Sequence, residues 1–123
     1  MQIHESAEDY LEKILMLKEQ KGVVRSIDIA NAMGYSKPSI SIAMKHLREN
    51  GYITMDQDNH IELTDAGRAI AERIYNRHLT LTMLLTRLGV PKEIAEKDAC
   101  KIEHDLSPET FDALKRCEEM LKN

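Results

Sequence analysis

The sequence predicts a mainly α fold, in which an N-terminal winged helix-turn-helix is followed by a further helical region. Three observations support this. The 123 residues include one Phe, four Tyr and no Trp, so Leu, Ile, Ala and Met must build the core, and these residues favour helices over a β-sandwich. Apolar residues recur every three or four positions over most of the chain. Two short β-like runs near the middle flank a polar loop.

Three helices are expected before that loop. The first extends from the candidate N-cap Ser6 to Gly22, a residue type that commonly ends helices. A short second helix covers 26–33 and is expected to end at Gly34. After a tight turn, a third helix opens with Ser36 as its N-cap and Pro38 in its first turn. Two helices joined by such a turn form a helix-turn-helix.

The β-like runs complete the N-terminal region. Residues 52–55 and 60–63 are interpreted as a hairpin with a four-residue loop, which adds a wing to the helix-turn-helix. Three further helices are expected at 64 to about 88, 92 to about 105, and from 107 onward, the first of them capped by Thr64-Asp-Ala-Gly67. We therefore place the winged helix-turn-helix in residues 1–63 and a second, helical region in residues 64–123.

The charge distribution adds a functional expectation. The net charge of −4 does not by itself suggest a nucleic-acid partner. Within 21–48, however, five basic residues stand against one acidic residue, a local charge of +4 that leaves −8 for the rest of the chain. Small polar residues at the start of a recognition helix suit base edges, and basic residues further along suit phosphates. The predicted DNA contacts are Arg25, Ser36, Lys37, Pro38, Ser39, Ser41, Lys45 and Arg48.

Other interpretations of this region stay open. Winged helices also serve as protein-interaction modules, and five basic residues can be an ordinary solvated face. Asp56 and Asp58 at the tip of the wing would repel phosphate. The wing is therefore expected to contribute little to DNA affinity.

Six side chains of metal-ligand type form a second constellation. Cys100, Glu103 and His104 are spaced i, i+3 and i+4, which places them on one face of a helix. A carboxylate pair on the first helix and a histidine in the long helix accompany them. Each cluster alone has an ordinary explanation, as a solvated face, a surface histidine or a small buried hydrophobe. Their joint occurrence favours a metal site made of Asp9, Glu12, His78, Cys100, Glu103 and His104.

The C-terminal helices contain more apolar residues than three small helices need to bury internally. This surplus predicts a homodimer interface, with burial of all these residues inside one subunit as the alternative. The expected interface residues are Leu81, Leu84, Leu85, Leu88, Phe111, Leu114, Cys117 and Leu121.

Several classes of protein are excluded. No apolar run approaches the roughly 18–20 residues that span a bilayer, and the N-terminus lacks the features of a signal peptide. Two cysteines do not make a disulfide framework, so a reducing, cytoplasmic location is expected. The sequence has no recognisable nucleophile arrangement or phosphate loop, so we expect no enzyme. A small metal-dependent hydrolase with Glu12 or Glu103 as general base is a remote alternative.

The motifs resemble those of the diphtheria toxin repressor family, in particular its short branch, the manganese transport regulators. The resemblance covers nearly the whole chain. It is carried by Glu8-Asp-Tyr-Leu-Glu12, Ser36-Lys-Pro-Ser-Ile-Ser41, Leu63-Thr-Asp-Ala-Gly67, Arg77-His78, Gly89-Val90 and Cys100-Lys-Ile-Glu-His-Asp-Leu-Ser107.

This resemblance implies a metal-activated, homodimeric repressor of metal-uptake genes that binds a palindromic double-stranded DNA operator. It also implies that the six side chains of the constellation are the metal ligands and that the last helices form the dimer interface. On this view, one or two Fe²⁺ or Mn²⁺ ions per subunit clamp the first helix to the dimerisation region and so set the spacing of the recognition helices. The alternative is a winged-helix regulator that senses no metal.

The chain departs from the family patterns at several positions. Manganese regulators have a glutamate at the position of Cys100, and the iron-responsive branch has a methionine at that of Asp9. Thr82 and Glu96 replace the glutamate and histidine of the iron branch's ancillary site, and Ile42 replaces a base-reading glutamine. The SH3-like domain of longer members is not expected. Carboxylate and imidazole ligands suit both Fe²⁺ and Mn²⁺, whereas a thiolate favours softer ions. This mixed ligand set therefore does not separate Fe²⁺ from Mn²⁺.

Overall fold

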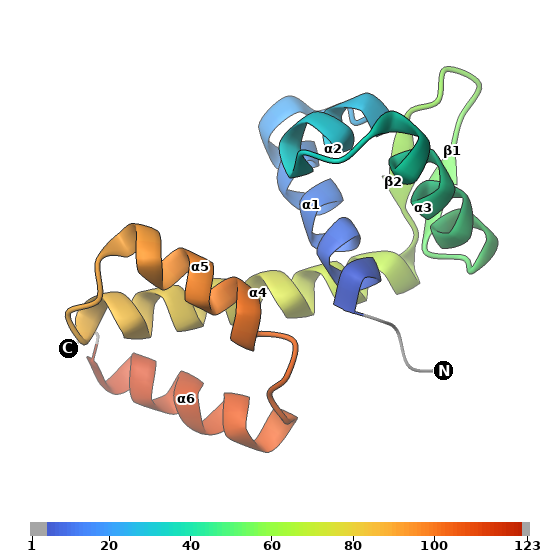
Figure 1. Cartoon of the computed structure of the whole chain (residues 1–123). Helices are drawn as coiled ribbons and strands as arrows, with labels where there is room; N and C mark the ends of the chain where they lie inside the picture. Colours follow the sequence, from blue (N-terminus) through green and yellow to red (C-terminus); the bar gives the residue numbers. More distant parts are fainter. Residues whose placement is uncertain (1–4, 122–123) are drawn as a thin grey trace. The chain divides into compact units, whose positions relative to one another are not determined.

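A computed structural model describes residues 5–121 and confirms the mainly α fold class (Figure 1). It divides into two compact units, one up to Glu72 and one from Arg73 onward, and the division falls within α4. Each unit is described below by itself. The elements are α1 (Glu5–Lys21), α2 (Ser26–Met33), α3 (Lys37–Glu49), β1 (Ile53–Met55), β2 (Ile61–Leu63), α4 (Asp65–Arg87), α5 (Lys92–Ile102) and α6 (Pro108–Leu121).

The helix-turn-helix of the first unit has the predicted start and stop signals. Gly34 ends α2 in the left-handed region, with φ of 72°, and its N–H donates to the carbonyl of Ala30. Ser36 caps α3, since its Oγ accepts the backbone N–H of Ser39 at 3.3 Å, and Pro38 lies in the first turn. The α1 cap was predicted wrongly, because Ser6 lies inside a helix that already includes Glu5.

Aliphatic side chains from every element fill the core of the first unit. Fully buried residues come from α1, α2, α3 and both strands, and α3 contributes one face through Ile40, Met44 and Leu47. The opposite face of α3 is left to solvent, as expected for an amphipathic helix. This packing fixes α3 while keeping its polar face available.

The wing is an antiparallel hairpin in which Ile53 pairs with Leu63 and Met55 with Ile61. Five residues, 56–60, connect the strands, so the prediction of a four-residue loop was wrong. The Asp56 carboxylate accepts the backbone N–H groups of Asp58 at 2.8 Å and His60 at 2.9 Å. These bonds hold His60 in the loop and not in the strand.

The start of α4 is fixed against the turn that precedes β1. The Thr64 hydroxyl donates to the carbonyl of Gly51 at 2.6 Å and accepts the N–H of Gly67 at 3.1 Å, which caps the helix as predicted. A side chain at Gly67 would place Cβ 2.0 Å from the carbonyl oxygen of Tyr52. Glycine is therefore required here by close backbone approach.

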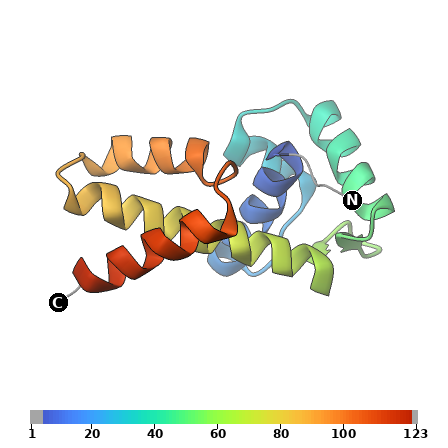
Figure 2. The ribbon, with the colours of Figure 1, turned by 90° about the horizontal axis from the view of Figure 1, so that it is seen from below.

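In the second unit, α5 and α6 lie along the C-terminal part of α4 in both views (Figures 1 and 2). Leu81 and Leu84 of α4 are buried together with Ala95 and Ala99, the small residues on the inner face of α5. α6 begins after Ser107, whose Oγ accepts the N–H of Thr110 at 3.1 Å.

The prediction that a helix extends to about residue 105 was wrong, because α5 ends at Ile102. Glu103 is its C-cap, and its N–H donates to the carbonyl of Ala99. His104 lies in the turn beyond the helix. Glu103 keeps helical backbone angles, so it lies about one turn from Cys100 as predicted, and only His104 lies beyond the helix.

Candidate metal centre and nucleic-acid interface

The structure leaves the predicted DNA-contacting face of the first unit open to solvent. All eight residues predicted to contact DNA are exposed. Ser41, Lys45 and Arg48 line a shallow hollow of about 150 Å³ together with Ser26 of α2. Lys45 lies 4.0 Å from Glu49, a loose and exposed ion pair that leaves its ammonium accessible. This face can offer hydroxyl and cationic donors to a polyanion.

Three predicted metal ligands come together in the second unit. The His78 Nδ1 atom, from α4, lies 3.0 Å from Oε2 of Glu103 and 3.7 Å from Sγ of Cys100 on α5. One ligand atom from each residue lies within 4.8 Å of the other two. Imidazole, thiolate and carboxylate in one place form a donor set suited to a divalent transition metal.

The electrostatics of this cluster also suit a cation. The Glu103 side chain is completely buried, and among the described residues its Oε1 has no hydrogen-bond partner, although Nε2 of His104 lies 3.6 Å away. A buried carboxylate that lacks full compensation is costly. Hydrogen bonds first to Cys100 and then to Glu103 raise the pKa of His78 to about 10. In the metal-free protein, a proton on His78 therefore supplies the charge that a bound cation would supply.

Arg77 holds the turn that contains the candidate ligands Glu103 and His104. This role was not predicted from the sequence. This buried arginine donates from Nη1 to the carbonyls of Glu103 at 3.0 Å and Leu106 at 2.8 Å. Its guanidinium also lies 5.3 Å from the centre of the Phe111 ring. The one signal in the sequence that could have indicated this role is the position of Arg77 directly before the candidate ligand His78.

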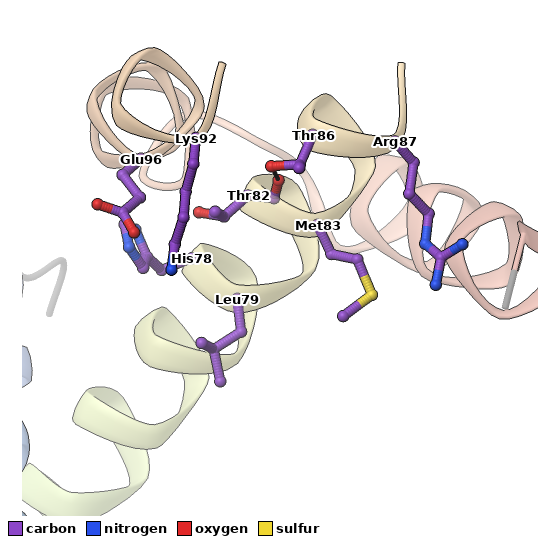
Figure 3. Close-up of a pocket in the computed structure, with 8 residues that line it drawn as sticks. All are labelled: His78, Leu79, Thr82, Met83, Thr86, Arg87, Lys92 and Glu96. Carbon is purple, nitrogen blue, oxygen red and sulfur yellow. Dashed lines mark hydrogen bonds between the residues drawn. The ribbon is translucent and has the colours of Figure 1, made fainter. Parts of the chain in front are cut away.

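A depression of about 510 Å³ is lined in part by His78 (Figure 3). Thr82 and Glu96, the positions that differ from the family's ancillary site, line it together with Lys92. In Figure 3, the Lys92 side chain extends from α5 toward the level of His78 and Glu96. The depression thus combines one carboxylate with a lysine cation, which disfavours a second metal ion at this place.

The other two predicted ligands belong to the first unit. Asp9 and Glu12 lie about one turn apart on α1. Their participation in metal binding stays a prediction.

The predicted interface residues differ in exposure. Leu81 and Leu84 are buried in the core of the second unit, so they can support an interface only by packing against the residues that form it, not by direct contact with a partner. Leu85, Phe111 and Leu114 are half-buried, whereas Leu88, Cys117 and Leu121 are exposed. Leu88 is 74% exposed.

Two family models together match nearly the whole chain. The model of the iron dependent repressor, N-terminal DNA binding domain matches residues 2–61, and that of the iron dependent repressor, metal binding and dimerisation domain matches residues 64–122. These matches imply a DNA operator and a homodimer as partners. They confirm the resemblance drawn from the sequence.

Similar proteins include transcriptional regulators of bacteria and archaea. The transcriptional regulator MntR of Salmonella typhimurium is 37% identical over 109 residues, which cover 89% of this chain and 69% of that protein. An uncharacterized HTH-type transcriptional regulator of Methanocaldococcus jannaschii is 32% identical over 121 residues, 97% of both chains.

Solved structures agree on the fold. A manganese-dependent transcriptional repressor in complex with manganese has a TM-score of 0.84 and 26% identity over 92% of this chain and 52% of that one. The T. acidophilum IdeR structure has a TM-score of 0.79 and 28% identity over 93% of this chain and 53% of that one. This chain thus spans about half the length of these structures. A related structure, that of ScaR, has bound Zn²⁺.

Proposed function

The chain belongs to the iron-dependent repressor family of transcriptional regulators, not to an enzyme family, and we propose that it represses metal-uptake genes when Fe²⁺ or Mn²⁺ is bound. One observation carries the metal dependence. The buried Glu103 carboxylate lies between His78 and His104 and beside Cys100, without full compensation of its charge by hydrogen bonds. This arrangement fits a divalent cation in its donor types and its charge.

We propose Asp9 and Glu12 as the ligands that complete the site, on the basis of their spacing and the family resemblance. A divalent cation would supply the positive charge that the three carboxylates require, and Asp9 and Glu12 would hold it from α1. Without that charge, Asp9 and Glu12 would be repelled by Glu103, and α1 would no longer be held to the metal-binding region. The helix-turn-helix follows α1 directly in the chain, so the state of α1 determines how α3 is presented.

We propose one tightly bound metal ion per subunit, within the range of one or two expected from the sequence. The support is the depression beside His78, where Lys92 already places a positive charge and Thr82 offers a weaker ligand than a carboxylate. Metal analysis of protein purified anaerobically would count the ions.

We propose that the DNA partner is a palindromic operator. Two copies of the chain related by a two-fold axis would present two α3 helices to half-sites separated by about 34–36 Å or a multiple of that distance. The exposed apolar residues Leu88 and Leu121 support self-association through the second unit.

The cytoplasmic location stays a proposal. Within residues 5–121, no helix combines the length and the apolarity that crossing a membrane would require.

The test compares DNA binding of Glu103→Gln with that of Glu93→Gln, a matched amide substitution at an exposed site in the first turn of α5, the helix that Glu103 caps. The probe is a duplex selected from a random pool by the Mn²⁺-loaded wild-type protein. We expect Mn²⁺ or Fe²⁺ to tighten binding of the wild type and of Glu93→Gln relative to chelator, and to leave Glu103→Gln unresponsive. Equal binding by the wild type with metal and with chelator would instead support a metal-independent regulator.

A further inference from the structure

The base of the wing lies beside the start of α2. The backbone N–H of Ile61 in β2 donates to the carbonyl of Val24 at 2.7 Å, outside the hairpin's own ladder. This bond sets residue 61 against residue 24, so their neighbours His60 and Arg25 lie opposite each other. The start of α2 also borders the candidate DNA face, because Ser26 lines the same hollow as Lys45 and Arg48.

A chain of three side chains crosses this junction. The Arg25 Nη2 atom lies 3.0 Å from Nε2 of His60, and the His60 Nδ1 atom lies 3.2 Å from Oδ2 of Asp56. A guanidinium can only donate, so Nε2 of His60 must accept. The imidazole is therefore neutral with its proton on Nδ1, from which it donates to Asp56.

Asp56 is held in place as the last member of this chain. Its other oxygen accepts the backbone N–H groups of Asp58 and His60. The hydrogen bond from the His60 backbone is the main cause that lowers the pKa of Asp56. The carboxylate thus stays ionised and fixes both the ring orientation and the tautomer of His60.

The backbone of Arg25 is fixed as well. Its N–H donates to Oδ2 of Asp28 at 2.9 Å, and its carbonyl accepts the N–H of Asp28 at 3.0 Å. A guanidinium has five N–H donors, and the bond to His60 engages one nitrogen. Donors on the other nitrogens can meet a phosphate while the side chain keeps its orientation.

We propose that His60 is a positioning residue for DNA binding, which holds the Arg25 guanidinium on the DNA face through the Arg25–His60–Asp56 chain. The proposal rests on the proposed DNA-binding function. It gives the wing two opposite effects: Asp58 at the tip repels the phosphate backbone, whereas Asp56 acts through His60 to orient a cation. Orientation before binding removes part of the entropy cost of immobilising a long side chain.

The first experiment is a double-mutant cycle on the Mn²⁺-loaded chain of 123 residues with the selected operator duplex. We expect His60→Ala to weaken binding by about two- to tenfold. Arg25→Ala should weaken it further and lower the slope of log affinity against log salt by about one. Adding His60→Ala to Arg25→Ala should change nothing more. Full additivity of the two effects, or tighter binding by His60→Ala, would overturn the proposal.

A matched pair of wing variants separates positioning from simple charge repulsion. Asp56→Asn and Asp58→Asn remove the same charge from the same loop. If the wing acts only by repelling phosphate, both should tighten DNA binding. We expect Asp58→Asn to tighten binding or leave it unchanged, and Asp56→Asn to weaken it. Equal tightening by both variants would contradict a positioning role.

The ¹⁵N chemical shifts of the His60 ring give a readout that needs no DNA. We expect the Nδ1-protonated tautomer in the wild type and a shift toward the Nε2-protonated tautomer in Arg25→Ala. A wild-type ring protonated on Nε2 would overturn the inference. Failure of the proposed function would look different: the wild type would bind no duplex under any metal condition, while the tautomer would be unchanged.

Discussion

The two units of this protein use charge in opposite environments. On the first unit, Lys37, Lys45 and Arg48 are exposed, so they would act on the proposed DNA partner through solvent. In the second unit, the Glu103 carboxylate is completely buried and depends on its immediate neighbours. Exposed charges contribute modestly and are screened by salt, whereas a buried charge is costly without a partner. Substitutions should therefore have small, salt-dependent effects in the first unit and large, salt-independent effects in the second.

Arg77→Met should have the largest effect of the variants proposed here. It leaves two carbonyls of the turn, those of Glu103 and Leu106, without their donor. We expect about 2–4 kcal/mol of lost stability in the metal-free protein. Metal affinity should fall by roughly 10- to 100-fold, as when a group that orients a ligand is removed.

Chemical denaturation and competitive metal titration measure these two effects. Arg73→Met, an exposed arginine on the same helix, is the matched control. Equal metal affinity for Arg77→Met and the wild type would show that the turn does not organise the site.

Cys100→Ser should change the choice of metal. The thiolate is the softest donor in the cluster, so its loss should weaken Co²⁺ and Zn²⁺ binding more than Mn²⁺ binding. Co²⁺ bound to the wild type should show a thiolate charge-transfer absorption band that Cys100→Ser lacks. Cys117→Ser, the matched control on α6, should retain the band. A band that persists in Cys100→Ser would exclude this cysteine as a ligand.

Loss of the His78 proton should make the metal-free protein less stable at high pH. Its pKa is raised from 6.5 to about 10, chiefly by Cys100, so the protonated ring stabilises the folded state. This contribution is complete below pH 6.5 and is lost as the pH rises through about 10. Thermal unfolding in chelator should show a falling Tm across this window, and His78→Gln should lack this part of the slope. A metal ion must displace the same proton, so metal affinity should increase with pH.

Lys45→Ala should have the smallest effect. We expect operator binding to weaken several-fold at low salt, with a salt slope reduced by about 0.9, as for the loss of one phosphate contact. Lys97→Ala, an exposed lysine on α5, should not change DNA binding. Filter binding at several salt concentrations measures both. An unchanged salt slope for Lys45→Ala would show that Lys45 contacts no phosphate and that the DNA contacts lie elsewhere than at this part of α3.

Local signals made much of the fold predictable. The α3 start at Ser36, the α2 end at Gly34 and the α4 cap at Thr64 depend on neighbours within four residues, so the sequence reveals them directly. The hydrophobic pattern of α3 likewise indicates its buried face. Such features require no knowledge of distant contacts.

The errors arose where distant residues determine local structure. The α5 helix stops at Ile102, and the turn behind it is held by Arg77, which is 26 residues away from Glu103. The position of β2 beside the start of α2 involves the bond from Ile61 to Val24, which no local pattern contains. The ligands His78, Cys100 and Glu103 were predicted as residue types, but their common location follows from packing of α5 on α4.

Reciprocal coupling between metal and DNA tests the central claim most directly. Mn²⁺ binding to the wild-type chain is measured by calorimetry with and without the selected operator duplex. If the metal favours the DNA-binding state, the duplex must increase Mn²⁺ affinity by the same factor by which Mn²⁺ increases DNA affinity. We expect that factor to be at least about fivefold, within the usual range of coupling between sites. An Mn²⁺ affinity that is identical with and without the operator would contradict the account.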